Sequence, residues 1–131
     1  MANVIKLRKG LDIALAGTAV QEVKTMEMSK VYGLVPDSFY GVKPKVVVKE
    51  GDAVKAGDAL FVDKLHPEVK FVSPVSGKVS LVERGERRKV LSIQVEADSQ
   101  QQYAEFPKGV PADGQKVKEL LLESGLFAFM R

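Results

Sequence analysis

The sequence predicts a mainly β (α+β) domain, a small barrel or sandwich of two interlocked halves followed by one C-terminal helix. Short runs rich in valine, isoleucine and phenylalanine recur along the chain, and these residue types suit a pleated, half-buried surface. Glycine turns separate the runs at close spacing. After residue 97 the pattern changes to a polar linker and then to apolar positions at helical spacing.

The strands are expected where β-branched and aromatic residues cluster between turn residues. Residues 11–30 show no clear period, although the part that ends at Gly17 could be extended. The last two strands are predicted to form a hairpin around residues 84–87. We interpret four of the apolar residues as core, namely Phe61, Val62, Phe71 and Leu81. The expected strands are 4–7, 30–35, 45–49, 59–64, 69–74, 77–84 and 89–97.

The stretch VKEGDAVKAGDALF, residues 48–61, contains nearly the same turn twice. We expect Gly51 and Gly57 to adopt positive φ, a conformation that a Cβ would penalise. Asp52 and Asp58 follow these glycines directly, and aspartate in this position commonly hydrogen-bonds to nearby backbone. The two carboxylates could instead form an acid–base pair, but the local role explains them without any chemistry.

One helix is predicted near the C-terminus, with Asp113 as its N-cap and Gly125 as its end. An apolar face at i, i+3, i+4 spacing is formed by Val117, Leu120 and Leu121. Beyond the helix the chain is densely apolar at Leu126, Phe127, Phe129 and Met130. Apolar ends of this kind are usually covered or continued by more protein, so we expect a piece of a longer chain.

Composition excludes several classes of protein. The 131 residues include no cysteine, which excludes disulfides, thiolate catalysis, iron–sulfur clusters and cysteine-ligated zinc. A net charge of +3 from well-mixed charges does not indicate a nucleic-acid-binding protein. No apolar run approaches the ~20 residues of a membrane span. No Gly-x-Gly occurs, so neither a Rossmann fingerprint nor a P-loop is present.

The candidate site residues are few, and we place no catalytic, cofactor-binding or metal-binding residue in this chain. His66 is the single histidine and lies beside Pro67 in a polar turn, without the clustered partners of a metal site or triad. The carboxylates of Asp63 and Glu68 flank this hairpin and are expected to be solvated. The densest basic patch could be a solvated hairpin tip, or it could contact a partner subunit or an anionic head group. Its members are Arg84, Arg87, Arg88 and Lys89.

Three aromatic residues lie in a turn-rich stretch, residues 32–42. Tyr32, Phe39 and Tyr40 either cover one end of the barrel or line a ligand groove. The residues themselves leave both interpretations open.

Residues 48–79 resemble the biotinyl/lipoyl-carrier barrel, also called the barrel-sandwich hybrid. The pattern is carried by Gly51-Asp52, Val54, Gly57, Leu60 and the motif Pro74-x-x-Gly77-x-Val79. In carriers the hairpin tip between the two halves holds the modified lysine. Here the tip is expected at His66-Pro67, and Lys64 and Lys70 flank it without occupying it. A carrier of biotin or lipoate therefore remains only an alternative. Adaptor domains of export systems share the barrel, but they should also show an anchor and long heptads.

Four blocks of sequence resemble the N-terminus of the A subunits of the sodium-translocating NADH:quinone reductases. They are VIKLRKGLDIALAG, GVKPKVVVKEGDAVKAGDALFVDK, FVSPVSGKVSLVERGERRKVL and LLLESGLFAFMR, in this order. The resemblance covers almost the whole chain and is weakest around residues 18–35. The C subunit of the related Rnf electron-transfer complex shares the barrel over less of the chain and is a second alternative.

The resemblance implies a function for the whole complex and an organisation for this chain. The complex would couple NADH oxidation and quinone reduction to sodium export, with this subunit peripheral on the cytoplasmic face of the bacterial inner membrane. The subunit would carry no flavin or iron–sulfur centre, and the partners of this chain would be the other subunits and the remainder of the A subunit. The expected parts are 1–45, strands and a turn-rich segment packing on the barrel; 46–97, the barrel; and 98–131, linker and helix.

Overall fold

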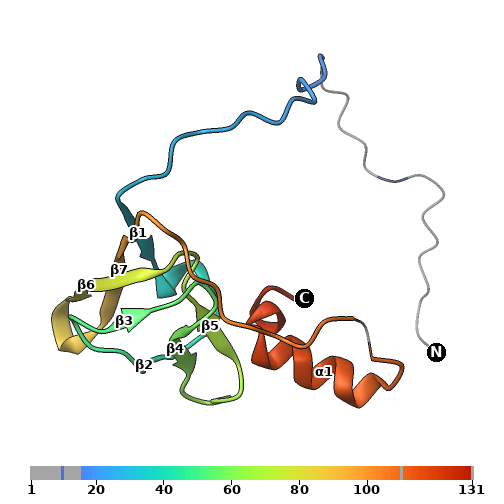
Figure 1. Cartoon of the computed structure of the whole chain (residues 1–131). Coiled ribbons are helices and arrows are strands. Elements are labelled where there is room, and N and C mark those ends of the chain that lie inside the picture. Colours follow the sequence, from blue (N-terminus) through green and yellow to red (C-terminus); the bar gives the residue numbers. More distant parts are fainter. Residues whose placement is uncertain (1–9, 11–15, 110, 131) are drawn as a thin grey trace.

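The computed structural model describes residues 10, 16–109 and 111–130, and within them seven strands and one α-helix (Figure 1). The strands are β1 Val31–Leu34, β2 Pro44–Val46, β3 Ala53–Val54, β4 Ala59–Asp63, β5 Lys70–Val72, β6 Gly77–Arg84 and β7 Val90–Ala97. The helix α1 spans Gly114–Glu123, and 3₁₀ turns occur at Pro36–Ser38, Glu86–Arg88 and Leu126–Phe129. The mainly β fold with one C-terminal helix is confirmed.

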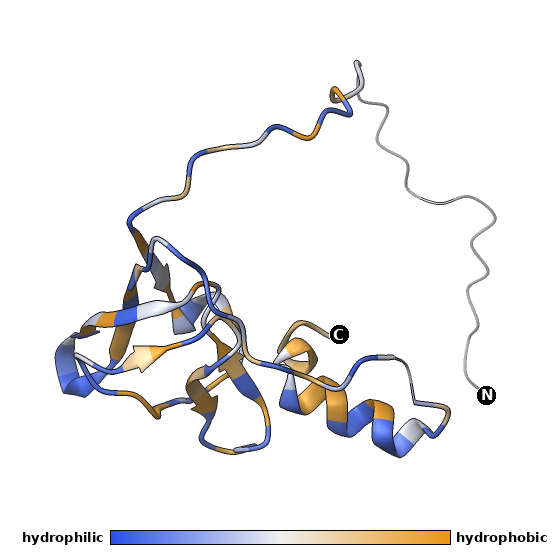
Figure 2. Cartoon of the chain, viewed as in Figure 1, coloured by the Kyte–Doolittle hydropathy of each residue, from blue (hydrophilic) through white to orange (hydrophobic). Residues whose placement is uncertain are grey.

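The strands form two antiparallel sheets, one ordered β1-β7-β6-β3 and the other β2-β4-β5. One buried cluster draws on both sheets, with Ile93 and Val95 from β7 and Phe61 from β4. Figure 2 shows that the apolar and polar residues of α1 lie largely on different sides of the helix. The predicted face of Val117, Leu120 and Leu121 is half-buried.

The two Gly-Asp turns perform the same task in the two halves of the barrel. The φ angles are +93° at Gly51 and +101° at Gly57, as expected. The first turn exchanges two backbone hydrogen bonds with Val79, from Gly51 N to Val79 O and from Val79 N to Asp52 O, both 2.8 Å. The second exchanges two with Ser73, at 2.9 and 2.8 Å. The repeat in the sequence therefore encodes two corners. The first is hydrogen-bonded to β6 at Val79, and the second to Ser73, directly after β5.

The aspartates of these turns have the local role predicted for them. The Oδ2 of Asp52 accepts a hydrogen bond from the backbone N–H of Lys49 at 2.8 Å, and Asp58 Oδ2 accepts one from Lys55 N–H at 2.7 Å. Each carboxylate closes its own turn by bonding three residues back along the chain. The two side chains therefore act as turn residues in separate corners, and they do not form an acid–base pair.

The helix begins and ends at the predicted residues. The side chain of Asp113 accepts a hydrogen bond from Gln115 N–H, and Gly125 has a φ of +76°. Gly125 is also buried, because the end of α1 packs against β5. An added Cβ there would lie 2.6 Å from Val72 Cγ1. The glycine therefore ends the helix and allows its close approach to the sheet.

Leu81 was wrongly predicted to lie in the core, because its side chain is 40% exposed. Strict alternation along β6 would place it on the same face as the buried Val79. The pairing with β7 shifts between Val79 and Leu81, where a bulge inserts one residue. The bulge turns Leu81 outward and gives the inward position to Val82, which packs against the core.

The first part of the chain differs from the expected strand pattern. The strand predicted at 45–49 extends only over Pro44–Val46. Val47 still donates its backbone N–H to Leu60 O of β4 at 3.1 Å, and the chain then enters the Gly51 corner. The strand expected at 4–7 lies outside the described residues. Residues 16–30 are exposed and lead away from the sheets (Figure 1). By contrast, β1 pairs with β7, so residues 31–46 contribute strands to both sheets.

Asp63, at the end of β4, is a buried carboxylate that the sequence did not single out in this role. It was expected to be solvated beside the hairpin, but the residue is only 8% exposed. Its Oδ1 accepts hydrogen bonds from the backbone N–H groups of Lys43 at 3.2 Å and Leu65 at 3.1 Å. The side chain thus ties the start of the β4–β5 hairpin to the segment that precedes β2.

Replacing Asp63 with alanine is expected to lower the free energy of unfolding by about 2 kcal/mol, because two backbone donors lose their acceptor. Asp63→Asn retains a carbonyl oxygen and should recover most of the loss. Urea unfolding followed by circular dichroism would measure both. Glu68→Ala is the matched control, since Glu68 is an exposed carboxylate of the same hairpin. Equal stability of Asp63→Ala and Glu68→Ala would contradict a structural role for Asp63.

Candidate functional site

The tip of the β4–β5 hairpin has no lysine. His66 and Pro67 occupy it, and the backbone N–H of Val69 closes the turn on His66 O at 2.9 Å. Lys64 lies at the base of the hairpin, where its N–H donates to Lys43 O at 2.7 Å. His66 Nδ1 is 3.9 Å from a carboxylate oxygen of Glu68, with both side chains exposed. No group of three acidic or histidine residues able to hold a metal occurs among the described residues.

The loop between β6 and β7 carries the predicted basic patch in an unusual backbone conformation. Arg87 and Arg88 have φ angles of 54° and 61°, in the left-handed region that favours glycine and asparagine. Two backbone hydrogen bonds hold the loop, from Gly85 N to Lys89 O at 2.8 Å and from Lys89 N to Glu86 O at 3.1 Å. Left-handed backbone costs roughly 1–2 kcal/mol per residue. The loop therefore has a fixed, strained shape.

A groove of about 480 Å³ lies between this loop, β2 and the β4–β5 hairpin, and we call it the basic groove. Its cationic lining residues are Lys45, Lys64, Arg84, Arg88 and Lys89, and its apolar ones are Pro44, Val46 and Val90. No acidic residue lines it. Lys89 forms an ion pair with Asp37, which approaches from the turn after β1.

The basic groove overlaps the predicted patch only in part. Arg84, Arg88 and Lys89 belong to both, whereas Arg87 does not line the groove. Lys45 and Lys64 were missed because they lie on other elements, 39 and 20 positions before Arg84 in the numbering. The alternation of β2 would have placed Lys45 on an outer face, but only the folded topology brings it beside the loop.

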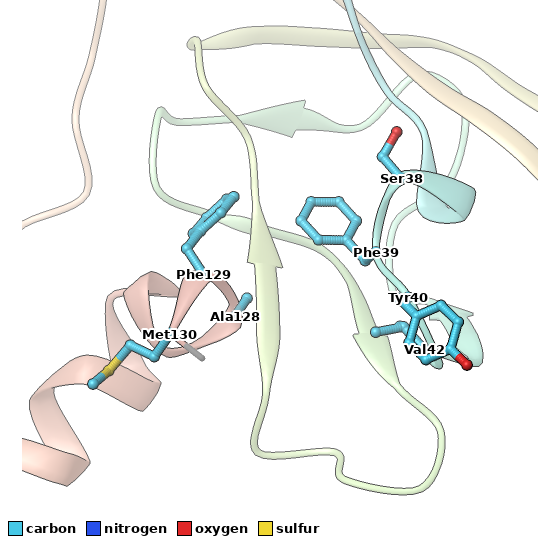
Figure 3. A pocket seen from close by; sticks show the side chains of 7 residues that line it. All are labelled: Ser38, Phe39, Tyr40, Val42, Ala128, Phe129 and Met130. Atoms are coloured by element: carbon cyan, nitrogen blue, oxygen red, sulfur yellow. The ribbon is translucent and has the colours of Figure 1, made fainter. Parts of the chain in front are cut away.

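A second pocket, of about 720 Å³ and lined by no charged residue, lies where the turn after β1 meets the end of the chain (Figure 3). The rings of Phe39 and Phe129, two of its lining residues, meet edge-on, with centroids 5.7 Å apart and planes inclined by 66°. Phe39 also packs edge-on against Phe71, at 4.6 Å. Tyr40 is fully exposed, and Tyr32 packs on the core. The aromatic stretch therefore covers the barrel through Tyr32 and Phe39, while Phe39 and Tyr40 line the pocket.

Residues 5–98 match the model of a protein family described as the NqrA N-terminal barrel-sandwich hybrid domain. The chain belongs to the NqrA N-terminal domain family. The two sheets and paired corners described above are the barrel of this family. The predicted resemblance to the reductase family and the barrel-sandwich hybrid fold are thereby confirmed, and the carrier alternative is not supported.

Relatives of this NqrA domain are named as the A subunit of the Na(+)-translocating NADH-quinone reductase. The chain is 39% identical over 133 residues to the protein of Yersinia pseudotuberculosis serotype O:1b. It is 34% identical over 132 residues to that of Pseudomonas aeruginosa UCBPP-PA14, and 35% over 133 residues to that of Neisseria meningitidis serogroup A. Each match covers 98% of this chain and 30% of the relative. The chain thus spans about a third of the length of these relatives.

In the part of the NqrA domain that the structure describes, no helix has the length and apolar character needed to cross a bilayer.

Proposed function

We propose that this chain is the N-terminal β module of the A subunit in a Na⁺-translocating NADH-quinone reductase and that its own role is architectural. The family match over residues 5–98 carries the proposal, and the relatives aligned over 98% of the chain support it. The barrel supplies a rigid core, locked at two corners by paired backbone hydrogen bonds. Such a module suits the ordering of a larger subunit and the presentation of loops to its neighbours.

The proposal assigns chemistry and location to the assembled reductase. NADH oxidation, quinone reduction and sodium export would occur in other parts of the complex, and the other subunits would be the partners of this chain. The module would lie at the cytoplasmic face of the bacterial inner membrane, as the resemblance to the family implies. We place no catalytic residue and no bound cofactor in this chain. The turn carboxylates Asp52 and Asp58 support this, because each is engaged in its own corner.

A chimeric protein tests the proposal. The first part of the Yersinia pseudotuberculosis relative would be replaced by this chain, over the aligned 133 residues. We expect the chimera to assemble with the other subunits, and membranes that contain it to reduce quinone with NADH. Copurification of the subunits and the quinone-reduction rate are the two measurements. A chimera that folds but does not assemble would contradict the proposal.

A chimera with His66→Ala tests the architectural part separately. His66 is the single histidine, its side chain is exposed, and the proposal gives it no chemical role. We expect unchanged assembly and an unchanged rate. A fully assembled complex whose turnover falls with this substitution would show that the hairpin tip takes part in the reaction.

A further inference from the structure

We infer that the basic groove binds an acidic polypeptide segment, one that carries carboxylates on both sides of an apolar side chain. The identity of the protein that carries this segment rests on the proposed function: a neighbouring subunit of the reductase would supply it. The binding itself is a property of this chain and can be measured on it alone.

Charge is the first reason. Five cationic side chains line one groove, and they come from β2, the β4–β5 hairpin, the end of β6 and the β6–β7 loop. Among the described residues only Lys89 of these five has an ion-pair partner, Asp37. A cleft lined by one sign of charge concentrates the field and attracts the opposite charge. An acidic ligand would relieve a repulsion that the fold leaves largely uncompensated.

Pre-organisation is the second reason. Arg84 ends a strand, Lys45 lies within one, and Arg88 is held by a strained loop with two internal hydrogen bonds. Backbone strain of this kind persists where the surrounding structure imposes it, and it clusters at binding sites. A fixed backbone leaves only the ordering of the side chains as a conformational entropy cost when a ligand binds. Figure 2 shows this loop as a hydrophilic end of the barrel.

The lining chemistry selects the ligand. The guanidinium groups of Arg84 and Arg88 suit carboxylates, which they can bind in a two-point fork. Three further lining residues, Pro44, Val46 and Val90, are apolar and suit a side chain placed between the acids. No aromatic residue lines the groove, so it offers no platform for stacked bases. The cations line a groove, whereas contact with a planar membrane surface requires protruding groups, so the groove suits a polypeptide segment better than a membrane.

The probe is a fluorescein-labelled peptide, Glu-Leu-Glu-Val-Glu-Leu, whose anisotropy is followed as the 131-residue chain is added. The test variant is K45E/R88E, which reverses one charge on each side of the groove. The control is K55E/K116E, which makes the same change in net charge at two exposed lysines outside the groove. Thermal melts would confirm that both variants fold.

We expect K45E/R88E to weaken peptide binding by at least about tenfold, since each reversal replaces an attraction by a repulsion. The control should bind within about twofold of the parent, because distant exposed charges are screened by salt. Affinity should also fall as salt rises. Equal losses in the two variants would overturn the inference, since net charge alone would then explain binding. Binding of inorganic phosphate or of phosphatidylglycerol vesicles, but not of the peptide, would overturn it too.

The chimera separates this inference from the proposed function. If the chain binds the peptide through the basic groove but the chimera does not assemble, the inference about the groove is supported and the proposed function is contradicted. If the chain does not bind the peptide and the chimera assembles normally even with K45E/R88E, the inference about the groove is contradicted and the proposed function is supported.

Discussion

Replacing Gly77 with alanine is expected to destabilise the barrel more than any other single methyl addition among the described glycines. Gly77 begins β6 and is paired with Val54 of β3 on one side and Ala97 of β7 on the other. An added Cβ would lie 1.8 Å from the backbone oxygen of Glu96 and 2.8 Å from its carbonyl carbon. Neither neighbour is a flexible side chain, so the strands themselves would have to separate.

The expected loss in the free energy of unfolding is at least about 3 kcal/mol, the upper range for overpacking, and it is large beside the roughly 5–15 kcal/mol of an ordinary domain. Urea unfolding would measure it, and a chain that fails to fold would agree with the prediction. Gly33→Ala is the control, because Gly33 also lies in the four-stranded sheet and its added Cβ would meet only Gln94 Cγ at 3.9 Å. Similar stability of the two variants would contradict the close approach of β6 and β7.

The corners of this fold could be predicted from sequence because their causes are local. A glycine that must adopt positive φ and an aspartate that bonds three residues back are both contained within four residues, so Gly51-Asp52 and Gly57-Asp58 can be recognised from the sequence. The same holds for Asp113 and Gly125 at the ends of α1. The hairpin tip at His66-Pro67 came from the resemblance to the carrier barrel, and the lack of a lysine there separated this barrel from a lysine-bearing carrier.

What the sequence missed depends on contacts between distant segments. The bulge that turns Leu81 outward is a property of the β6–β7 pairing, and no residue type at that position reveals it. Asp63 looked like a solvated hairpin carboxylate because one of its two donors, Lys43, is distant in sequence and is brought to it by the pairing of β2 with β4. Only part of the basic groove could be predicted, for the same reason. Arg84 and Arg88 are close in sequence, but Lys45 joins them only after folding.

Replacing Phe71 with alanine should lower the free energy of unfolding by about 3–5 kcal/mol, the range for a large aromatic residue removed from a core. Phe71 is 2% exposed and its ring stacks on Phe61, with centroids 4.4 Å apart and planes inclined by 7°. Phe39 packs on the same ring edge-on at 4.6 Å. The cavity would lie beneath the turn that follows β1, so the loss combines burial with two aromatic contacts.

Tyr40→Ala is the matched control, since Tyr40 is the neighbour of Phe39 in sequence but is fully exposed and should matter by less than about 0.5 kcal/mol. Phe39→Ala should fall between the two, because Phe39 is half-buried and touches both the core and Phe129. In the double variant Phe39→Ala/Phe71→Ala the two losses should sum to more than the measured loss, since one shared contact is removed twice. Strict additivity would mean that the turn after β1 does not rest on the core. The pocket of about 720 Å³ would then have a movable wall, whereas coupling would show that its Phe39 side is fixed by the barrel.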